Sequence, residues 1–347
     1  MSTKQSLDKL FSTLILRHLE RYASIPEKLI YIVYQALIRL IDSKIIIEDP
    51  LISFSDLSES KIEQTLPIVN NDVFIESLIR KIRYEGFGMN FHQLTAQLGA
   101  IMIQFCGNEQ QQKEVLRWGQ GVFLMTDKGG ANLTSWLSES IQEKDGLISL
   151  KINKIWAIEA HKAKFCIVNV KKKSMMAPLA FFISPDKYQT LNKSPIGLKF
   201  LDNYVQLGNV EGSVIVTKND QLSAGGIVGV NRFLALARPR FILSVMAHLQ
   251  WLIEKDRLYI DKDYYQVIET INLIASKIIS KNIFNRYSIE EVLALKLTSN
   301  EILLDLVLNN AVPSIFDQRD LLALGKMEGS SYRCMHELYM RTKRAVD

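Results

Sequence analysis

The sequence lacks the residue patterns of several common enzyme classes. Its five histidines do not cluster, and it contains no His-Glu-x-x-His, no paired Cys-x-x-Cys and no Gly-x-Ser-x-Gly. Metal-dependent hydrolysis and Ser-His catalysis are therefore unsupported. Cys106, Cys166 and Cys334 are an odd number of cysteines at no metal-ligand spacing. Thiols of this kind are typical of core packing in a reducing compartment, so we expect a cytoplasmic protein.

Long apolar runs and strong charge are also absent. The longest apolar window, residues 29–41, contains Gln35 and Arg39, so it predicts a buried helix and not a membrane span. The first residues contain no apolar signal segment, and we expect no secretion. The net charge of +5 favours acidic partners, such as cofactor phosphates or an acidic carrier protein. It is too small to indicate a nucleic-acid surface, and the basic runs 171–173 and 341–344 are not interleaved with aromatic residues.

The remaining sequence is long enough and apolar enough to fold throughout. Its 347 residues, 48% of them apolar, allow one large domain or two to three smaller ones. Apolar residues recur at helical spacing over residues 7–116, alternate with period two over about 119–220, and return to helical spacing after Gly229. We therefore expect an α+β, mostly α, chain with an all-helical part at 1–118, a β barrel or sandwich at 119–228 and a helical part at 229–347.

Individual elements follow from the same periodicity and from turn residues. Asp145-Gly146 is a hairpin signal, and the chain should break at Glu85–Gly88 and at Cys106–Gly107 before a helix that starts at Glu109. The expected strands are 121–126, 147–153, 154–158, 165–170, 179–183 and 212–217. The expected later helices are 233–259, 264–281, 289–309 and 332–343.

One stretch stands out for its chemistry. Phe123–Ser135 has the pattern of an apolar strand that runs into a tight turn at Gly129-Gly130, where glycine allows close approach of a flat ligand. The Thr126 hydroxyl and nearby amides could donate to carbonyl or phosphate oxygens, and Trp156 could cover a ring face. From these residues alone, a plain β-turn between two strands is the simpler interpretation.

Six short segments carry a more specific signal through their order. They are Arg83–Met89, Cys106–Leu116, Thr126–Asn132, Lys154–Trp156, Leu236–Pro239 and Lys326–Ser331. In this order, and over nearly the whole chain, they resemble segments of the acyl-CoA dehydrogenase family, among them its T-E-P-x-x-G-S-D, K-x-W-I-T and I-Y-E-G-T-x motifs. The resemblance implies a helical N-terminal domain, a middle β-domain and a C-terminal helical bundle, with FAD between them.

The resemblance also implies a reaction and the residues that perform it. The family removes two hydrogens across the α–β bond of an acyl thioester, with a carboxylate as the α-proton base and the flavin as hydride acceptor. Glu328 matches that base, Gly329 would clear the bulk beside the substrate's α-carbon, and Arg238 lies at the start of the substrate-pocket helix. The positive end of the following helix would help to keep Glu328 ionised. Ala237 occupies the family's alternative base position, so Glu328 is the sole candidate.

A set of flavin contacts is implied in the same way. The Met125 amide and the Thr126 hydroxyl would hydrogen-bond the flavin ring edge, and Trp156 would lie against the ring. Asn132 would stand where the family has a Ser that meets flavin phosphate or substrate. Ile158 occupies the position of a family Thr that donates to the flavin.

Other departures affect the adenine-diphosphate half of the FAD site. The family's R-x-x-F-G segment is replaced by Asp261–Tyr265, and its G-G-x-G region by Asn309–Pro313. Two hypotheses follow. The first is a FAD-dependent dehydrogenase of an acyl-CoA or an acyl carrier protein in a biosynthetic pathway, assembled as a homodimer or tetramer. The second is a redox-inactive relative that binds an acyl thioester, performs proton transfer with Glu328 alone, or serves as a partner subunit.

Overall fold

The structure is a computed structural model that describes residues 31–32, 35–36, 71–118, 120–130, 132–172, 178–197, 199–222, 226–281 and 286–343. The described chain divides into two compact units. The sheet unit contains residues 71–81 and 87–233, and the helical unit contains residues 82–86 and those from 234 onward. The helices predicted before residue 71 lie outside the described residues, except for 31–32 and 35–36, which are helical.

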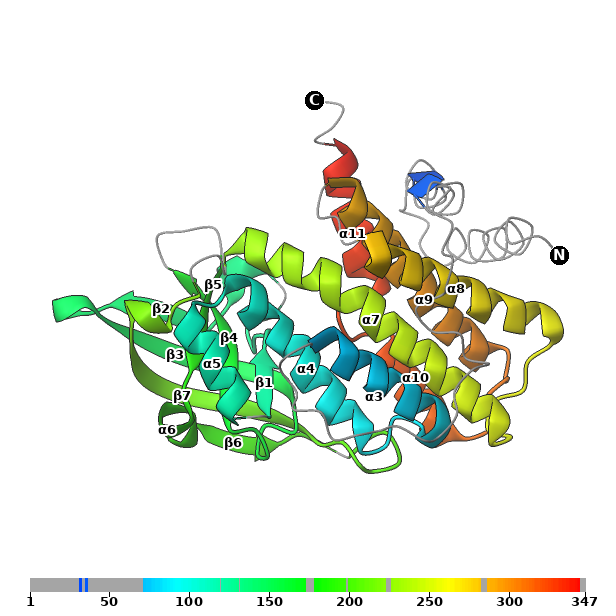
Figure 1. The fold of residues 1–347 in the computed structure, drawn as a ribbon, viewed down its shortest axis with the longest axis horizontal. Coiled ribbons are helices and arrows are strands. Elements are labelled where there is room, and N and C mark those ends of the chain that lie inside the picture. The colour runs from blue at the N-terminus through cyan, green and yellow to red at the C-terminus, as the bar shows by residue number, and fades with distance from the viewer. Residues whose placement is uncertain are drawn as a thin grey trace. The chain divides into compact units, whose positions relative to one another are not determined.

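The sheet unit is built on a seven-stranded mixed sheet (Figure 1). The spatial order is β1-β4-β2-β3-β7-β6, and β5 also pairs with β4. β4 runs parallel to β1 and β2, and the remaining pairs are antiparallel. The strands are β1 (Gly121–Leu124), β2 (Glu139–Gln142), β3 (Leu147–Ile158), β4 (Phe165–Lys172), β5 (Pro178–Ile183), β6 (Asn192–Pro195) and β7 (Leu207–Thr217).

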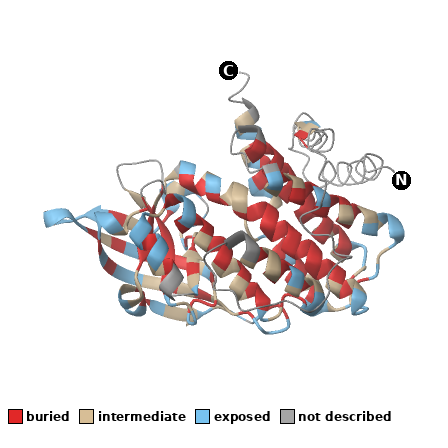
Figure 2. Ribbon diagram, in the orientation of Figure 1, coloured by how far each residue is buried: buried red, intermediate tan, exposed pale blue. Residues whose placement is uncertain are grey.

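The core of the sheet unit follows from the alternation of its strands. Successive strand residues point to opposite faces, and β3 accordingly alternates buried with more exposed positions along most of its length (Figure 2). The buried side chains gather in one apolar cluster that includes Leu150, Ile152, Val168, Val214 and Val216. Burial of this cluster is the main favourable contribution to the stability of the unit.

Most predicted strands are confirmed, with two differences. Residues 147–153 and 154–158 form a single strand, β3, whose pairing with β7 is interrupted by a bulge between Lys154 and Ala157. β2 and β6 were not predicted because they are short and polar. The hairpin prediction is confirmed, since Asp145 (φ 60°) and Gly146 (φ 75°) adopt the positive φ of a tight turn between β2 and β3.

Two helices, α4 and α5, and several short helical turns belong to the sheet unit. α4 (Asn90–Cys106) packs on β1, where a Cβ atom at Gly99 would lie only 3.2 Å from Phe123 Cβ. The predicted stop at Cys106–Gly107 and the helix from Glu109 are confirmed by the end of α4 and by α5 (Glu109–Trp118). The other helical turns are α6 (Pro185–Gln189), η2 (Leu133–Ser135), η3 (Lys144–Gly146) and η4 (Lys218–Asp220).

The helical unit surrounds one buried helix. α9 (Arg286–Leu308) contacts α8 (Lys262–Lys281), α10 (Ile315–Leu324) and α11 (Ser331–Lys343), and every residue from 288 to 303 is buried. A helix buried on all sides belongs to the centre of a bundle. α7 (Ile227–Glu254) contributes its residues from 234 onward.

The helical predictions are confirmed for α7, α8, α9 and α11, and α10 was not predicted. α3 (Asn71–Glu85) ends at the predicted break, where Gly86 has φ 74°. The domain boundaries after residues 118 and 228 stay a prediction. No helix in the described ranges is both long enough and apolar enough to cross a membrane.

Candidate active site

The loop between α10 and α11 presents Glu328 in a strained backbone conformation. Glu328 has φ 56°, a left-handed value that is uncommon for a residue with a side chain. Two side chains from other helices hold this loop. Arg238 Nε on α7 donates a 2.8 Å hydrogen bond to the Glu328 carbonyl oxygen, and Asn300 Nδ2 on α9 donates one of 3.0 Å to the Gly329 carbonyl oxygen. The strain therefore persists because the surroundings fix the loop at consecutive residues.

Position 329 accepts only glycine without rearrangement. Gly329 has φ 118°, and an added Cβ atom would lie 3.1 Å from Arg238 Nη2 and 3.4 Å from Cys334 Sγ. The sequence interpretation gave Gly329 the task of clearing the substrate's α-carbon. The structure supplies a separate reason for glycine, which is the close approach of Arg238.

Glu328 is partly buried, and two cations lie near its carboxyl group. Burial raises the pKa of Glu328 above its ordinary value, and Arg238 and Lys296 oppose that rise without cancelling it. We expected the positive end of the following helix to keep Glu328 ionised, but the two side-chain cations oppose burial and the pKa is raised overall. Within the described chain, no cation lies within ion-pair distance of this carboxylate, so both cations act through space.

Sequence reasoning missed two members of this site. Lys296 and Asn300 are buried on α9, one helical turn apart, and Lys296 Nζ lies 2.5 Å from Asn300 Oδ1. The available signal was a lysine inside the otherwise apolar run of residues 292–297. The lysine can be recognised as unusual only once α9 is known to be buried on every side.

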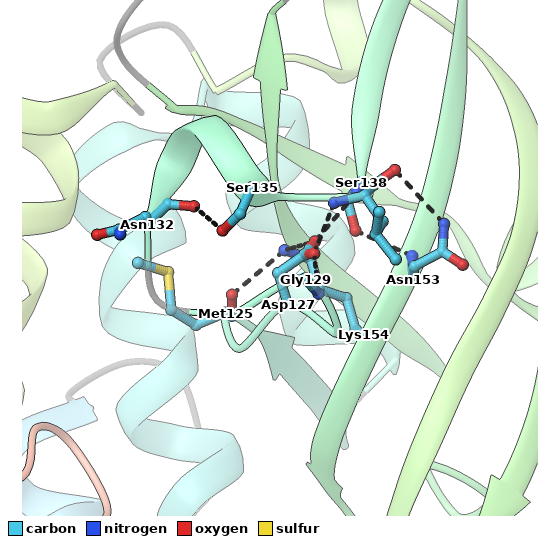
Figure 3. Close-up of polar contacts among 9 residues, drawn as sticks. Met125, Asp127, Gly129, Asn132, Ser135, Ser138, Asn153 and Lys154 are labelled. Atoms are coloured by element: carbon cyan, nitrogen blue, oxygen red, sulfur yellow. Dashed lines mark hydrogen bonds and ion pairs between the residues drawn. The ribbon is translucent and has the colours of Figure 1, made fainter.

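The second candidate region is the turn after β1, in the sheet unit. The buried Asp127 carboxylate organises it by accepting three main-chain hydrogen bonds (Figure 3). Their donors are Gly129 N at 2.9 Å, Leu137 N at 2.7 Å and Ser138 N at 3.0 Å. Burial alone would raise the pKa of Asp127, but these donors and Lys154 outweigh burial and lower it.

Lys154 joins this turn to β3. It is fully buried, and its Nζ lies 3.3 Å from Asp127 Oδ2 and 3.2 Å from the Met125 carbonyl oxygen (Figure 3). The same Nζ lies 4.1 Å from the Trp136 ring centroid. Burial lowers the pKa of Lys154 to about 8, although Asp127 opposes the shift. Sequence analysis included Asp127 only as part of the segment Thr126–Asn132, and it missed the pairing with Lys154.

The bulge in β3 places two of the predicted flavin contacts side by side. Ile155 N donates a 3.0 Å hydrogen bond to the Thr126 carbonyl oxygen, so the chain next to Trp156 pairs with the chain after β1. Trp156 has φ 61° and is 53% exposed, and Thr126 is also exposed. A bulge re-aims a side chain in this way. Among the described residues, neither the Thr126 hydroxyl nor the Trp156 indole has a partner.

The other predicted contacts are arranged differently. Met125 lies directly before Thr126, and the Met125 carbonyl oxygen accepts a hydrogen bond from Lys154 Nζ. Asn132 is exposed beyond the glycine turn, and its carbonyl oxygen accepts hydrogen bonds from Ser135 N and Oγ (Figure 3). Ile158 pairs with Leu207 and offers no polar side-chain atom. The structure thus brings the chain at Met125 and Thr126 next to the chain at Trp156 within the sheet unit.

The residues fit one half of FAD better than the other. An exposed indole beside an unpartnered hydroxyl suits a flat ring with polar edges. The two segments that replace the family's diphosphate motifs instead have local structural roles. In the first segment, Asp261 Oδ1 accepts a 2.7 Å hydrogen bond from Tyr264 N at the start of α8. In the second, Ala311 N donates a hydrogen bond to the Leu306 carbonyl oxygen at the end of α9. Neither segment contains an arginine.

Comparisons with known proteins identify the fold. No protein-family model matches the chain, and no curated protein sequence matches it significantly. Among solved structures, a glutaryl-CoA dehydrogenase from Mycobacterium smegmatis in complex with FADH2 has a TM-score of 0.61 at 15% identity over 80% of each chain. The flavoprotein nitroalkane oxidase has a TM-score of 0.64 at 11% identity, over 98% of this chain and 94% of its own. The prolyl acyl carrier protein oxidase AnaB has 0.57 at 12% identity, over 91% and 98%.

These similarities agree with the α+β, mostly helical architecture predicted from apolar periodicity and with the fold implied by the order of the six segments. At such low identity the similarity shows the fold and no more. This chain has the acyl-CoA dehydrogenase-like fold, in a form whose sequence has diverged far from those of its structural neighbours.

Proposed function

We propose that this protein is a flavin-dependent oxidoreductase that dehydrogenates an acyl thioester, with Glu328 as the base that takes the α-proton. One observation carries the proposal. The partly buried Glu328 carboxyl group has a raised pKa and lacks an ion-pair partner in the described chain, while Arg238 holds the Glu328 carbonyl oxygen and Asn300 holds that of Gly329. The similar structures support the same kind of reaction, since they include a CoA thioester dehydrogenase and an acyl carrier protein oxidase.

The chemistry follows from the surroundings of Glu328. A raised pKa makes the carboxylate a stronger base for the α-proton. Arg238 and Lys296 keep the anionic form accessible in spite of burial. FAD, when bound, supplies the acceptor for the β-hydride. Met125, Thr126 and Trp156 would hold its ring, and Asn132 would meet its phosphate or the substrate.

The substrate and the assembly are proposed more broadly. An acyl-CoA or an acyl carrier protein suits the net charge of +5, because both partners are acidic. A homodimer or tetramer is proposed on the resemblance to the family.

The experiment begins with the visible absorbance spectrum of the purified protein, before and after denaturation. We expect flavin bands in near-stoichiometric amount, and bleaching of these bands by acyl-CoA or acyl carrier protein thioesters under anaerobic conditions. Glu328→Gln should leave the flavin bands unchanged and abolish the bleaching, because an amide cannot accept the α-proton. Equal bleaching by the variant would remove Glu328 from the mechanism.

A redox-silent proton-transfer protein is the second candidate. Ile158 offers no donor, and residues 261–265 and 309–313 carry no arginine for a diphosphate. The distinguishing result is a protein that stays colourless with excess FAD yet exchanges the α-proton of a thioester in D₂O, as followed by NMR. Glu328→Gln would abolish that exchange as well, so the spectrum separates the two candidates and the variant tests the base in both.

A further inference from the structure

Lys296 is a fully buried cation that has no acidic partner at ion-pair distance within the described chain. Its Nζ atom contacts the neutral Asn300 Oδ1 at 2.5 Å and lies 5.1 Å from the Phe241 ring centroid. Burial and the nearby Arg238 lower the pKa of Lys296 to about 8, although Cys334 and Glu328 oppose the shift. A lone buried ammonium group is costly, and an apolar side chain of similar size would avoid that cost. A fold keeps such a group most readily at a functional site.

Two physical links connect Lys296 to the loop that carries Glu328. The first link is a relay of hydrogen bonds from Lys296 to Asn300 Oδ1 and from Asn300 Nδ2 to the Gly329 carbonyl oxygen at 3.0 Å. An ammonium group only donates, so it must face the amide oxygen, and the amide nitrogen is then directed to Gly329. The second link is electrostatic, since Lys296 and Glu328 each shift the titration of the other in favour of its charged form.

We propose that Lys296 is a positioning residue for Glu328, which orients the Gly329 backbone through Asn300 and favours the carboxylate form of Glu328. This inference rests on the proposed function of Glu328 as the base. Among the described residues, the other titratable or charged groups that face the pair are Arg238 from α7 and Cys334 from α11. Arg238 holds the Glu328 carbonyl oxygen, so the two cations fix consecutive residues of the loop from different helices.

The test is an NMR titration of the Glu328 carboxyl group, in protein labelled with ¹³C at glutamate side chains and identified by Glu328→Gln. In Lys296→Met we expect the Glu328 midpoint to shift to higher pH, because the favourable cation is lost. Lys154→Met is the matched control, since Lys154 is equally buried and its pKa is also lowered to about 8. An unchanged midpoint in Lys296→Met, or an equal shift in Lys154→Met, overturns the proposal.

A reciprocal measurement covers the case in which Lys296→Met does not fold. Coupling between two sites is mutual, so Glu328→Gln should move the Lys296 titration, followed by ¹³C-labelled lysine, to lower pH. A Lys296 midpoint that is the same in the parent and in Glu328→Gln contradicts the proposal.

Activity adds an independent readout. Lys296→Met should shift the acidic limb of the kcat profile to higher pH with little change in KM, and an unmoved limb would contradict the proposal. Because both NMR titrations need neither flavin nor thioester, they separate the two claims. Shifted titrations in a protein without thioester chemistry would refute the proposed function alone, and unshifted titrations in an active enzyme would refute the role of Lys296 alone.

Discussion

Arg238 Nε donates its 2.8 Å hydrogen bond to the main-chain carbonyl oxygen of Glu328, and the guanidinium makes no ion pair with the carboxylate of the same residue in the described chain. A carboxylate that is paired with a cation accepts protons poorly. A nearby cation that binds only the backbone stabilises the negative charge of the carboxylate and leaves its oxygens available to accept a proton. Arg238 therefore fixes the position of Glu328 without blocking its basicity.

Glu328→Gln should gain stability relative to the parent as pH rises. The folded-state pKa is raised, so the stabilising effect of the protonated carboxyl is complete below the ordinary value of 4.5 and is lost as pH rises through the folded pKa. The amide cannot ionise and does not lose this contribution. Urea unfolding between pH 4 and pH 8 checks the trend, and Glu143→Gln, at an exposed position, controls for loss of one negative charge. A stability difference that is flat with pH would contradict the raised pKa.

In the proposed reaction, turnover by Glu328→Gln should fall by about 10²–10⁴-fold.

Asp127→Asn should destabilise the sheet unit by about 3–5 kcal/mol, because it leaves the buried Lys154 without its counterion. Lys128→Met is the matched control, since it breaks an exposed pair with Glu211 at 2.9 Å and should cost less than about 1 kcal/mol. Urea denaturation measures both. Adding Lys154→Met to Asp127→Asn should recover part of the loss, and a double variant no more stable than the single one would argue against an isolated charge as the cause.

Gly329→Ala should cost about 2–3 kcal/mol, from its positive φ and from the contact with Arg238 together. Gly130→Ala isolates the first effect, since Gly130 has a similar φ of 105° and its added Cβ atom would meet only Ser135 Oγ at an ordinary contact distance of 3.8 Å. That control should cost about 1 kcal/mol. Thermal unfolding of the two variants gives the difference, and equal losses would mean that Arg238 moves aside freely.

Trp156→Gly should change the stability of the flavin-free protein by less than about 1 kcal/mol, because relief of the positive-φ strain is offset by the lost burial of the indole and by the greater freedom of glycine in the unfolded chain. The same variant should weaken flavin binding by about tenfold through loss of ring stacking. Fluorescence titration with FAD measures the affinity. Lower stability with unchanged affinity would identify Trp156 as a structural residue.

Periodicity predicted the parts of the fold in which local pattern and burial agree. The long strands β3 and β7 and the helices α4, α8 and α9 have apolar residues at the spacing of their elements. β2 and β6 have only short, polar sequences, so their pairing is determined by neighbouring strands. α10 was missed because its first residues, Ile315 and Phe316, are exposed and give no amphipathic signal.

The residues of the candidate site also differ in whether the sequence alone could predict them. The order of motifs placed Arg238 and Glu328 in one site although 90 residues separate them. The pairing of Asp127 with Lys154 is a tertiary contact that neither segment encodes alone. Lys296 and Asn300 are close in sequence, but their importance depends on burial, which results from packing of the whole bundle.

Complete burial of α9 limits which amino-acid substitutions this helix can tolerate. A helix with one solvent face, such as α8, accepts polar replacements every three or four codons, so tolerated substitutions follow the helical repeat. Residues 288–303 have no such face. Replacements there must conserve volume at every position, and a saturation scan would show a continuous intolerant block in place of a periodic one.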